Sequence, residues 1–174
     1  KLHAPNWFIE NQDGSKNPHD EIDNPFRSAE VLQAHVDEGL HYARKNRLPK
    51  QIANFIPEHQ GTLKMGYFFQ KAKEKNLKIN ENDFRYKGPI PQSKETAILM
   101  LADGCEAALR AMNINASDNE ALETISRIIY SRHKDGQLDD SNLSKGEIFL
   151  IKRAFLNVWK RIRHRRIQYP TSKN

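Results

Sequence analysis

Three side chains able to bind a metal ion stand far apart in this chain of 174 residues: His35, His59 and Asp103. Each lies on or at the end of a predicted helix and is expected to face inward, so the fold can bring all three to one ion. Imidazole and carboxylate donors without thiolates suit manganese or ferrous iron better than a structural zinc. Two such ions bridged by a carboxylate can hold a hydroxide nucleophile and a phosphodiester together. These residues therefore predict a hydrolase.

The same three residues also have a purely structural interpretation. A single histidine on an apolar helix face is more often a hydrogen-bonded core residue, and a helical aspartate can pair with a lysine or cap a turn. Cys105, the only cysteine, stands in the same apolar helix as Asp103, where it is expected to be a small buried hydrophobe and not a nucleophile. It permits no internal disulfide, which favours a cytosolic compartment. The spacing alone leaves both interpretations open.

The composition favours one globular domain spanning 1–174. The mass is 20.2 kDa, hydrophobic residues make up 37% and the mean hydropathy is −0.81, which indicates a real core under a very polar surface. No stretch approaches the roughly eighteen apolar residues of a membrane span, and the N-terminus has no apolar signal core. Because the chain lacks an initiator Met and opens in what reads as the middle of a motif, we expect a piece of a longer protein.

The charge pattern raises one alternative function. The net charge is +6 and the pI is about 9.4, and much of the excess lies in the last predicted helix. A basic helix can bind nucleic acid, with an affinity that falls steeply with salt. A charge run is more often a solvated face, so duplex nucleic acid is not the expected partner.

Helical periodicity predicts an all-α fold. Residues 1–27 carry turn signals and predict an irregular N-terminal loop, and the proline-rich stretch 79–92 predicts a second long loop. No stretch alternates as a strand would. The periodic apolar faces predict about six helices, at 28–43, 49–60, 63–76, 93–112, 118–134 and 145–165.

Capping residues sharpen these helix starts. Ser28 and Ser93 are predicted N-caps, and Ser117 and Ser144 open capping boxes because a glutamate follows each three residues later. The last helix is predicted to bury one stripe of apolar side chains: Ile148, Ile151, Phe155, Val158, Trp159 and Ile162.

Many short sequence motifs follow one another along nearly the whole chain. They include Trp7-Phe8-Ile9-Glu10-Asn11-Gln12, Asn17-Pro18-His19-Asp20, Ser28 to His35, Leu48-Pro49, His59-Gln60-Gly61-Thr62, Tyr67-Phe68, Gly88-Pro89, Pro91-Gln92-Ser93-Lys94-Glu95, Met100-Leu101-Ala102-Asp103, Gly136-Gln137-Leu138 and Arg166-Ile167-Gln168-Tyr169-Pro170. Together they resemble the HD-domain phosphodiesterases, specifically the cytosolic domain of the seven-transmembrane HD family that hydrolyses cyclic di-AMP. The resemblance implies an HD-domain helical bundle.

The resemblance also implies a ligand set for two divalent ions, manganese or iron. His35 looks like the family's single histidine, His59 like the first of its His-His pair and Asp103 like its late aspartate. Lys1 looks like the lysine that follows the family's adjacent His-Asp pair, which places that pair, an upstream histidine and the bridging carboxylate before it. Gln60 stands where the second histidine of the pair is expected, and marks a weak or lost metal position because a carboxamide is a poorer ligand than imidazole.

The implied function is hydrolysis of cyclic di-AMP to linear pApA by a metal-bound hydroxide. The chain would work at the cytoplasmic face of the bacterial cell membrane, as part of a longer multi-pass signalling protein. Related cyclic di-GMP enzymes carry a Gly-Tyr-Pro word, which fails here at Phe68 in Gly66-Tyr67-Phe68. Because of Gln60, a catalytically degenerate domain that serves as a nucleotide-binding or regulatory module stays an alternative.

Further side chains are candidates for the substrate, since basic groups pair with phosphates and aromatic rings stack on bases. Each also has an ordinary reading as surface or core. His3 and His19 lie near the predicted mouth of the site but are expected to face solvent. The substrate candidates are Thr62, Lys64, Tyr67, Arg85, Tyr86 and Lys94.

Overall fold

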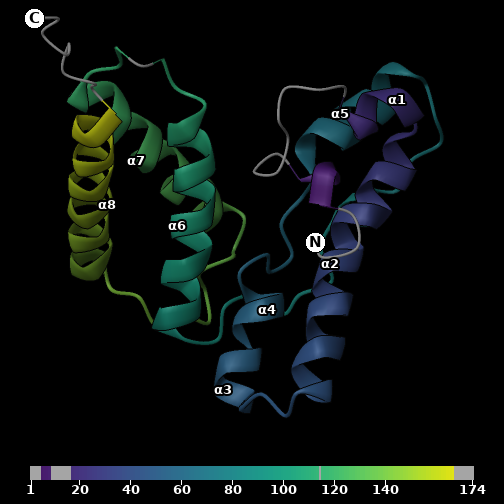
Figure 1. Ribbon diagram of the computed structural model, residues 1–174, viewed down its shortest axis with the longest axis horizontal. Helices are drawn as coiled ribbons and strands as arrows, with labels where there is room; N and C mark the ends of the chain where they lie inside the picture. The colour runs from purple at the N-terminus through teal and green to yellow at the C-terminus, as the bar shows by residue number, and fades with distance from the viewer. Residues whose placement is uncertain (1–4, 9–16, 114, 167–174) are drawn as a thin grey trace, which may run out of the picture. The chain divides into compact units, whose positions relative to one another are not determined.

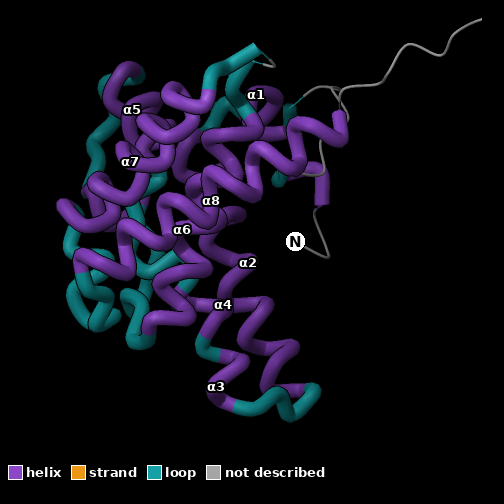
Figure 2. The backbone as a smooth tube through the Cα atoms, turned by 90° about the vertical axis from the view of Figure 1, so that its left-hand side faces the viewer, coloured by secondary structure: helices purple, strands orange, loops and turns teal. Residues whose placement is uncertain are grey.

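The computed structural model describes residues 5–8, 17–113 and 115–166. They fall into two compact units, Lys1–Ile90 and Pro91–Asn174, each of which is described by itself. Throughout the described ranges the regular backbone is helical, apart from an isolated antiparallel bridge between Lys64 and Arg85 (Figure 2). The all-α prediction is confirmed, whereas the single-domain organisation stays a prediction.

The first unit is organised around one long helix. In Figure 1, α2 runs through the unit, with α1 and α5 beside one end and α3 and α4 beside the other. Chain order gives the 3₁₀ helix Pro5–Trp7, α1 (Pro18–Ile22), α2 (Pro25–Lys45), α3 (Lys50–Ala53), α4 (Phe55–Glu58), α5 (Gly66–Glu74) and the 3₁₀ helix Glu81–Phe84.

Residues 17–27 are more regular than predicted. Asn17 and Asn24 each accept hydrogen bonds from the backbone N–H groups that follow them, and a proline in the next position starts α1 and α2. The prediction of an irregular 1–27 is therefore wrong in part. Ser28 is not a cap either, because α2 begins one turn earlier and Ser28 is buried inside it.

Two other helix predictions needed correction. The helix predicted at 49–60 is interrupted at Asn54, which separates α3 from α4. The helix predicted from residue 63 starts at Gly66 because the chain before it pairs with the chain after the 3₁₀ helix Glu81–Phe84. Met65 N donates to Phe84 O at 2.8 Å, and Tyr86 N donates to Leu63 O at 3.0 Å. The predicted 79–92 loop therefore contains a helical turn and a backbone bridge.

A small apolar cluster fixes this bridge and α5 against α2. Aromatic pairs reinforce it, including Phe26 with Phe84 at 5.0 Å between ring centroids. The cluster consists of Ala29, Met65, Phe68, Ala72 and Phe84, each at most 8% exposed. The segment after the second candidate histidine is thus held in place by apolar packing.

The second unit packs α6 (Lys94–Arg110), α7 (Asp118–Lys134) and α8 (Lys145–Arg166) side by side (Figure 1). Both capping boxes with glutamate are confirmed by reciprocal hydrogen bonds: Ser117 with Glu120, and Ser144 with Glu147. Ser93 is the N-cap of α6, as predicted. The core is apolar and comprises Ala97, Leu101, Cys105, Leu109, Ala121, Ile125, Ile129, Leu138 and Ile151.

The predicted core stripe of the last helix is only partly buried. Ile151 is 8% exposed, but Val158 is 53% and Ile162 is 45% exposed. Both line a cavity of about 600 Å³ between α6 and α8. Among the described helices, none is long and apolar enough to cross a membrane.

Candidate active site

Two of the three predicted metal ligands come together in the first unit. His35 projects from α2 and His59 caps the C-terminus of α4, and their ring centroids lie 5.6 Å apart with an interplanar angle of 67°. Close helix packing makes this possible: a β-carbon at Gly39, one turn after His35, would lie 2.8 Å from Ile56 Cγ2. Glycine therefore lets α2 and α4 approach, which brings the two imidazoles together.

Both imidazoles are anchored through the same nitrogen. His59 Nδ1 lies 2.7 Å from Ile56 O and 3.1 Å from Phe55 O, and His35 Nδ1 contacts Leu32 O. Since a carbonyl oxygen only accepts, Nδ1 carries the proton and donates, and Nε2 carries the lone pair. Metal-binding histidines characteristically donate their second nitrogen to a carbonyl in this way. We call His35 and His59 the imidazole pair.

Two aromatic rings pack against the His35 ring of the imidazole pair. Phe8 and Tyr86 meet the His35 ring edge to face, with centroids at 5.4 and 5.9 Å. Phe8 is itself 6% exposed. Tyr86 was predicted as a substrate residue, and the structure shows it beside His35.

His19 holds the segment that carries Phe8. Its Nε2 donates to Trp7 O at 2.8 Å, and its ring packs against Trp7 and Phe68. At 7% exposure, His19 does not face solvent, so that expectation is wrong; His3 lies outside the described residues. The signal that could have revealed this is Asn17-Pro18, which starts a helix and turns His19 inward.

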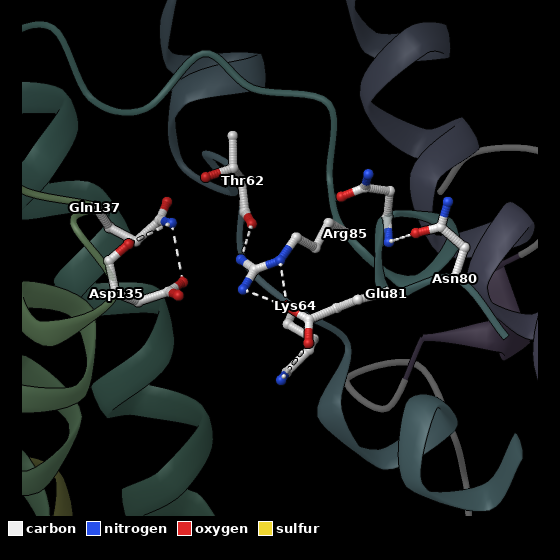
Figure 3. Close-up of polar contacts among 8 residues, drawn as sticks. Thr62, Lys64, Asn80, Glu81, Arg85, Asp135 and Gln137 are labelled. Atoms are coloured by element: carbon white, nitrogen blue, oxygen red, sulfur yellow. Dashed lines mark hydrogen bonds and ion pairs between the residues drawn. The ribbon is translucent and has the colours of Figure 1, made fainter. Parts of the chain in front are cut away.

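Three predicted substrate residues form one polar network (Figure 3). Arg85 donates to Thr62 O at 2.9 Å and to Glu81 Oε1 at 2.8 and 3.0 Å, and Lys64 lies 3.2 Å from the other oxygen of the same carboxylate. The hydrogen bonds from Arg85, and then from Lys64, hold the pKa of Glu81 below its usual value. The two cations thus neutralise a local carboxylate, and Arg85 also fixes the turn that follows His59.

Tyr67 and Lys94 lie in other settings. Tyr67 is 65% exposed on α5, and its ring meets Phe68 at 5.1 Å. Lys94, in the second unit, pairs with Glu147 at 2.6 Å. That hydrogen bond, together with those from Ser144, lowers the pKa of Glu147 to about 2. Lys94 therefore links the first turns of α6 and α8.

The third predicted ligand, Asp103, belongs to the second unit. Its side chain on α6 is exposed, so the expectation that it faces inward is wrong. The neighbouring Cys105 is 1% exposed, and burial raises its thiol pKa to about 11, which confirms its prediction as a buried hydrophobe. Arg132 of α7 lies close enough to Asp103 and Cys105 to interact electrostatically with both. Arg132 was not singled out in the sequence analysis. A glycine inside a helix, here Gly104, often marks a close approach by another group, and Arg132 is that group.

The imidazole pair fits part of a metal site. The described residues contain no group of three or more His, Cys, Asp or Glu side chains that could hold an ion. The pair offers two anchored nitrogen donors, a chemistry suited to first-row divalent ions. Gln60 directly follows His59 and is half-buried, in a turn that Gly61 completes with φ of 53°.

The chain is similar to cyclic di-AMP phosphodiesterases. It is 38% identical over 170 residues to the cyclic-di-AMP phosphodiesterase PgpH of Bacillus subtilis, covering 98% of this chain and 24% of that protein. It is 47% identical over 175 residues to the uncharacterized protein slr0104 of Synechocystis, covering 98% of this chain and 22% of that protein. The chain thus spans about a quarter of the length of these relatives. No protein-family profile matches it.

The fold is also that of a solved HD domain. The crystal structure of the Listeria monocytogenes PgpH HD domain in complex with cyclic di-AMP superposes with a TM-score of 0.87 at 34% identity, covering 93% of this chain and 75% of that one. At this identity and coverage, both the fold and the family are established.

Proposed function

The chain belongs to the PgpH-like HD-domain family, and on that premise we propose that it hydrolyses a phosphodiester bond of a cyclic dinucleotide, converting cyclic di-AMP to linear pApA. The observation that carries the proposal is the imidazole pair. His35 and His59 come from different helices, and a carbonyl oxygen accepts from Nδ1–H of each, which puts the lone pair of each imidazole on Nε2.

Divalent ions, manganese or iron, are the cofactors of the proposal. His35, His59 and Asp103 are the proposed ligands. Such an ion, when bound, would supply Lewis acidity for the reaction. The chain's own residues orient the donors: Leu32 O and Ile56 O fix the ring tautomers.

The two rings packed against His35 support a rigid and partly shielded position for that imidazole. Phe8 and Tyr86 cover faces and edges of His35, which reduces access of bulk water and strengthens electrostatic interactions there. Tyr86 also offers a ring on which a base can stack. Arg85 and Lys64 act through Glu81 and the Thr62 turn, so we assign them to positioning the segment beside His59.

A nucleotide-binding or regulatory module without catalysis is the second candidate. Gln60 favours it, because a carboxamide oxygen next to His59 is a weaker metal ligand than the imidazole expected there. On either candidate, the proposed location is the cytoplasmic face of a bacterial membrane, within a longer protein.

One assay separates the two candidates. The whole protein is incubated with cyclic di-AMP and Mn²⁺, and the linear product is measured by chromatography. Hydrolysis is expected, with loss of product after chelation and after His59→Ala. Cyclic di-AMP binding without any linear product would establish the regulatory candidate instead.

The variant Gln60→His tests the weakened position directly. Because imidazole binds first-row ions better than carboxamide, Mn²⁺ affinity is expected to rise about tenfold. Gln60→Asn, which keeps the carboxamide, is the matched control. Equal Mn²⁺ affinity for all three proteins would remove Gln60 from the metal site.

A further inference from the structure

Arg132 is an arginine that makes no ion pair within 4 Å in the described part of the chain, although Asp103 and Asp135 lie close enough to interact with it electrostatically. It stands in the last turn of α7, and its side chain reaches α6 at Gly104. A β-carbon built on Gly104 would lie 3.1 Å from Nη2 and 3.8 Å from Cζ of Arg132. The guanidinium therefore packs against α6 at Gly104, where a β-carbon would displace it by a few tenths of an ångström.

In this position the guanidinium is partly removed from water. Nε is buried and makes no hydrogen bond, and no ion pair within 4 Å involves Arg132 among the described residues. Desolvation by burial lowers its pKa, while electrostatic interactions with Cys105, Asp135 and Asp103 act in the opposite direction. Arginine nevertheless stays protonated in proteins. A partly buried charge that makes no ion pair loses solvation free energy, and a bound anion would offset that loss.

The nearest carboxylates do not fill that role. Asp135 instead accepts a hydrogen bond from Gln137 Nε2 at 3.0 Å (Figure 3). Asp103 precedes Gly104 on α6 but lies beyond ion-pair distance of Arg132, and its side chain is exposed. The guanidinium therefore retains N–H donors next to the carboxylate that the proposed function assigns to a metal.

The geometry points to Arg132 as a substrate-binding residue that donates to a non-bridging phosphate oxygen of the phosphodiester, beside Asp103. The inference rests on the proposed function, which supplies the phosphodiester. A phosphodiester has two non-bridging oxygens, so one can face a metal while the other accepts from a guanidinium. Gly104 allows the guanidinium to pack closely against α6.

The test measures the affinity of the whole protein for two phosphodiesters, cyclic di-AMP and bis(4-nitrophenyl) phosphate, with Ca²⁺ in place of Mn²⁺ to slow turnover. Loss of a charge-assisted hydrogen bond is expected to weaken both affinities about ten- to hundredfold in Arg132→Gln, and less in Arg132→Lys. Gly104→Ala keeps the charge but displaces it, so it should weaken both affinities as well. Arg127→Gln, an exposed arginine on the same helix, is the matched control.

The outcomes separate this inference from the proposed function. Unchanged affinity of Arg132→Gln for both probes overturns the role of Arg132, even if its melting temperature falls. Equal weakening by Arg127→Gln does the same, because it shows a diffuse charge effect. Binding of the nitrophenyl diester but not of cyclic di-AMP, with dependence on Arg132, supports the inference and refutes the proposed substrate. A whole protein that binds neither probe refutes both.

Discussion

The close approach of α2 and α4 predicts that Gly39→Ala disturbs the imidazole pair without touching it. The new β-carbon would lie 2.8 Å from Ile56 Cγ2 and 3.9 Å from Ile56 Cδ1. Carbon atoms in contact normally stand about 3.5–4.0 Å apart. The two helices must therefore separate by up to about 1 Å, or Ile56 must leave its preferred rotamer.

The expected magnitudes differ between stability and metal binding. Overpacking costs about 1–3 kcal/mol, and replacing a helical glycine by alanine returns about 1 kcal/mol. The net loss in free energy of unfolding is therefore about 0–2 kcal/mol. Metal–ligand distances tolerate only about 0.2 Å, and His59 follows Ile56 by three residues and uses its carbonyl. Mn²⁺ affinity should thus fall by about tenfold or more.

Urea unfolding and Mn²⁺ titration of the whole protein measure both effects. Gly146→Ala is the control, because a β-carbon there meets nothing within 4 Å, and it should raise stability slightly. Ile56→Leu removes the branching methyl at Cγ2, so the double variant with Gly39→Ala should recover by about 0.5–3 kcal/mol in a mutant cycle. Unchanged Mn²⁺ affinity in Gly39→Ala, with no coupling to Ile56, would refute the reasoning.

Three more predictions concern single side chains. The folded-state pKa of Glu147 is depressed to about 2 from 4.5, so its stabilising contribution is present above about pH 4.5 and is lost as the pH falls toward 2. Between these pH values the free energy of unfolding of Glu147→Gln should fall less than that of the unmodified protein. Equal pH slopes for the two proteins would contradict this. His19→Leu should remove the hydrogen bond to Trp7 O and weaken Mn²⁺ binding about tenfold. His41→Leu, at an exposed histidine, should leave Mn²⁺ binding unchanged. Equal effects of the two variants on Mn²⁺ affinity would exclude positioning by His19. Because Cys105 is buried with its thiol pKa near 11, it should react with a thiol reagent only on unfolding, and rapid reaction in the native protein would contradict its burial.

Local sequence signals were sufficient for most helices of this chain. Ser93, Ser117 and Ser144 were predicted as caps, and their hydrogen bonds are those that a cap makes with its own first turn. Periodicity likewise placed His35 on the apolar face of a helix. Such interactions span three or four residues, so they can be read from the chain itself.

Predictions failed where a local pattern permits more than one outcome. Ser28 is an acceptable cap, but Asn24 followed by proline starts the helix earlier, and Ser28 is buried. Val158 and Ile162 have the right spacing for a core stripe, yet they are exposed. An apolar side chain becomes core only where another element covers it, and helical spacing carries no information about that element.

The sequence by itself determined most of the helices, three of the four predicted caps and which residue types could bind a metal, because those properties depend on neighbours along the chain. The tertiary structure decided that His35 and His59 meet, through the contact of Gly39 with Ile56. It also decided that Arg132 lies against Gly104. These contacts join residues far apart in sequence, and they depend on how closely two helix backbones can approach, which is a property of packing in three dimensions.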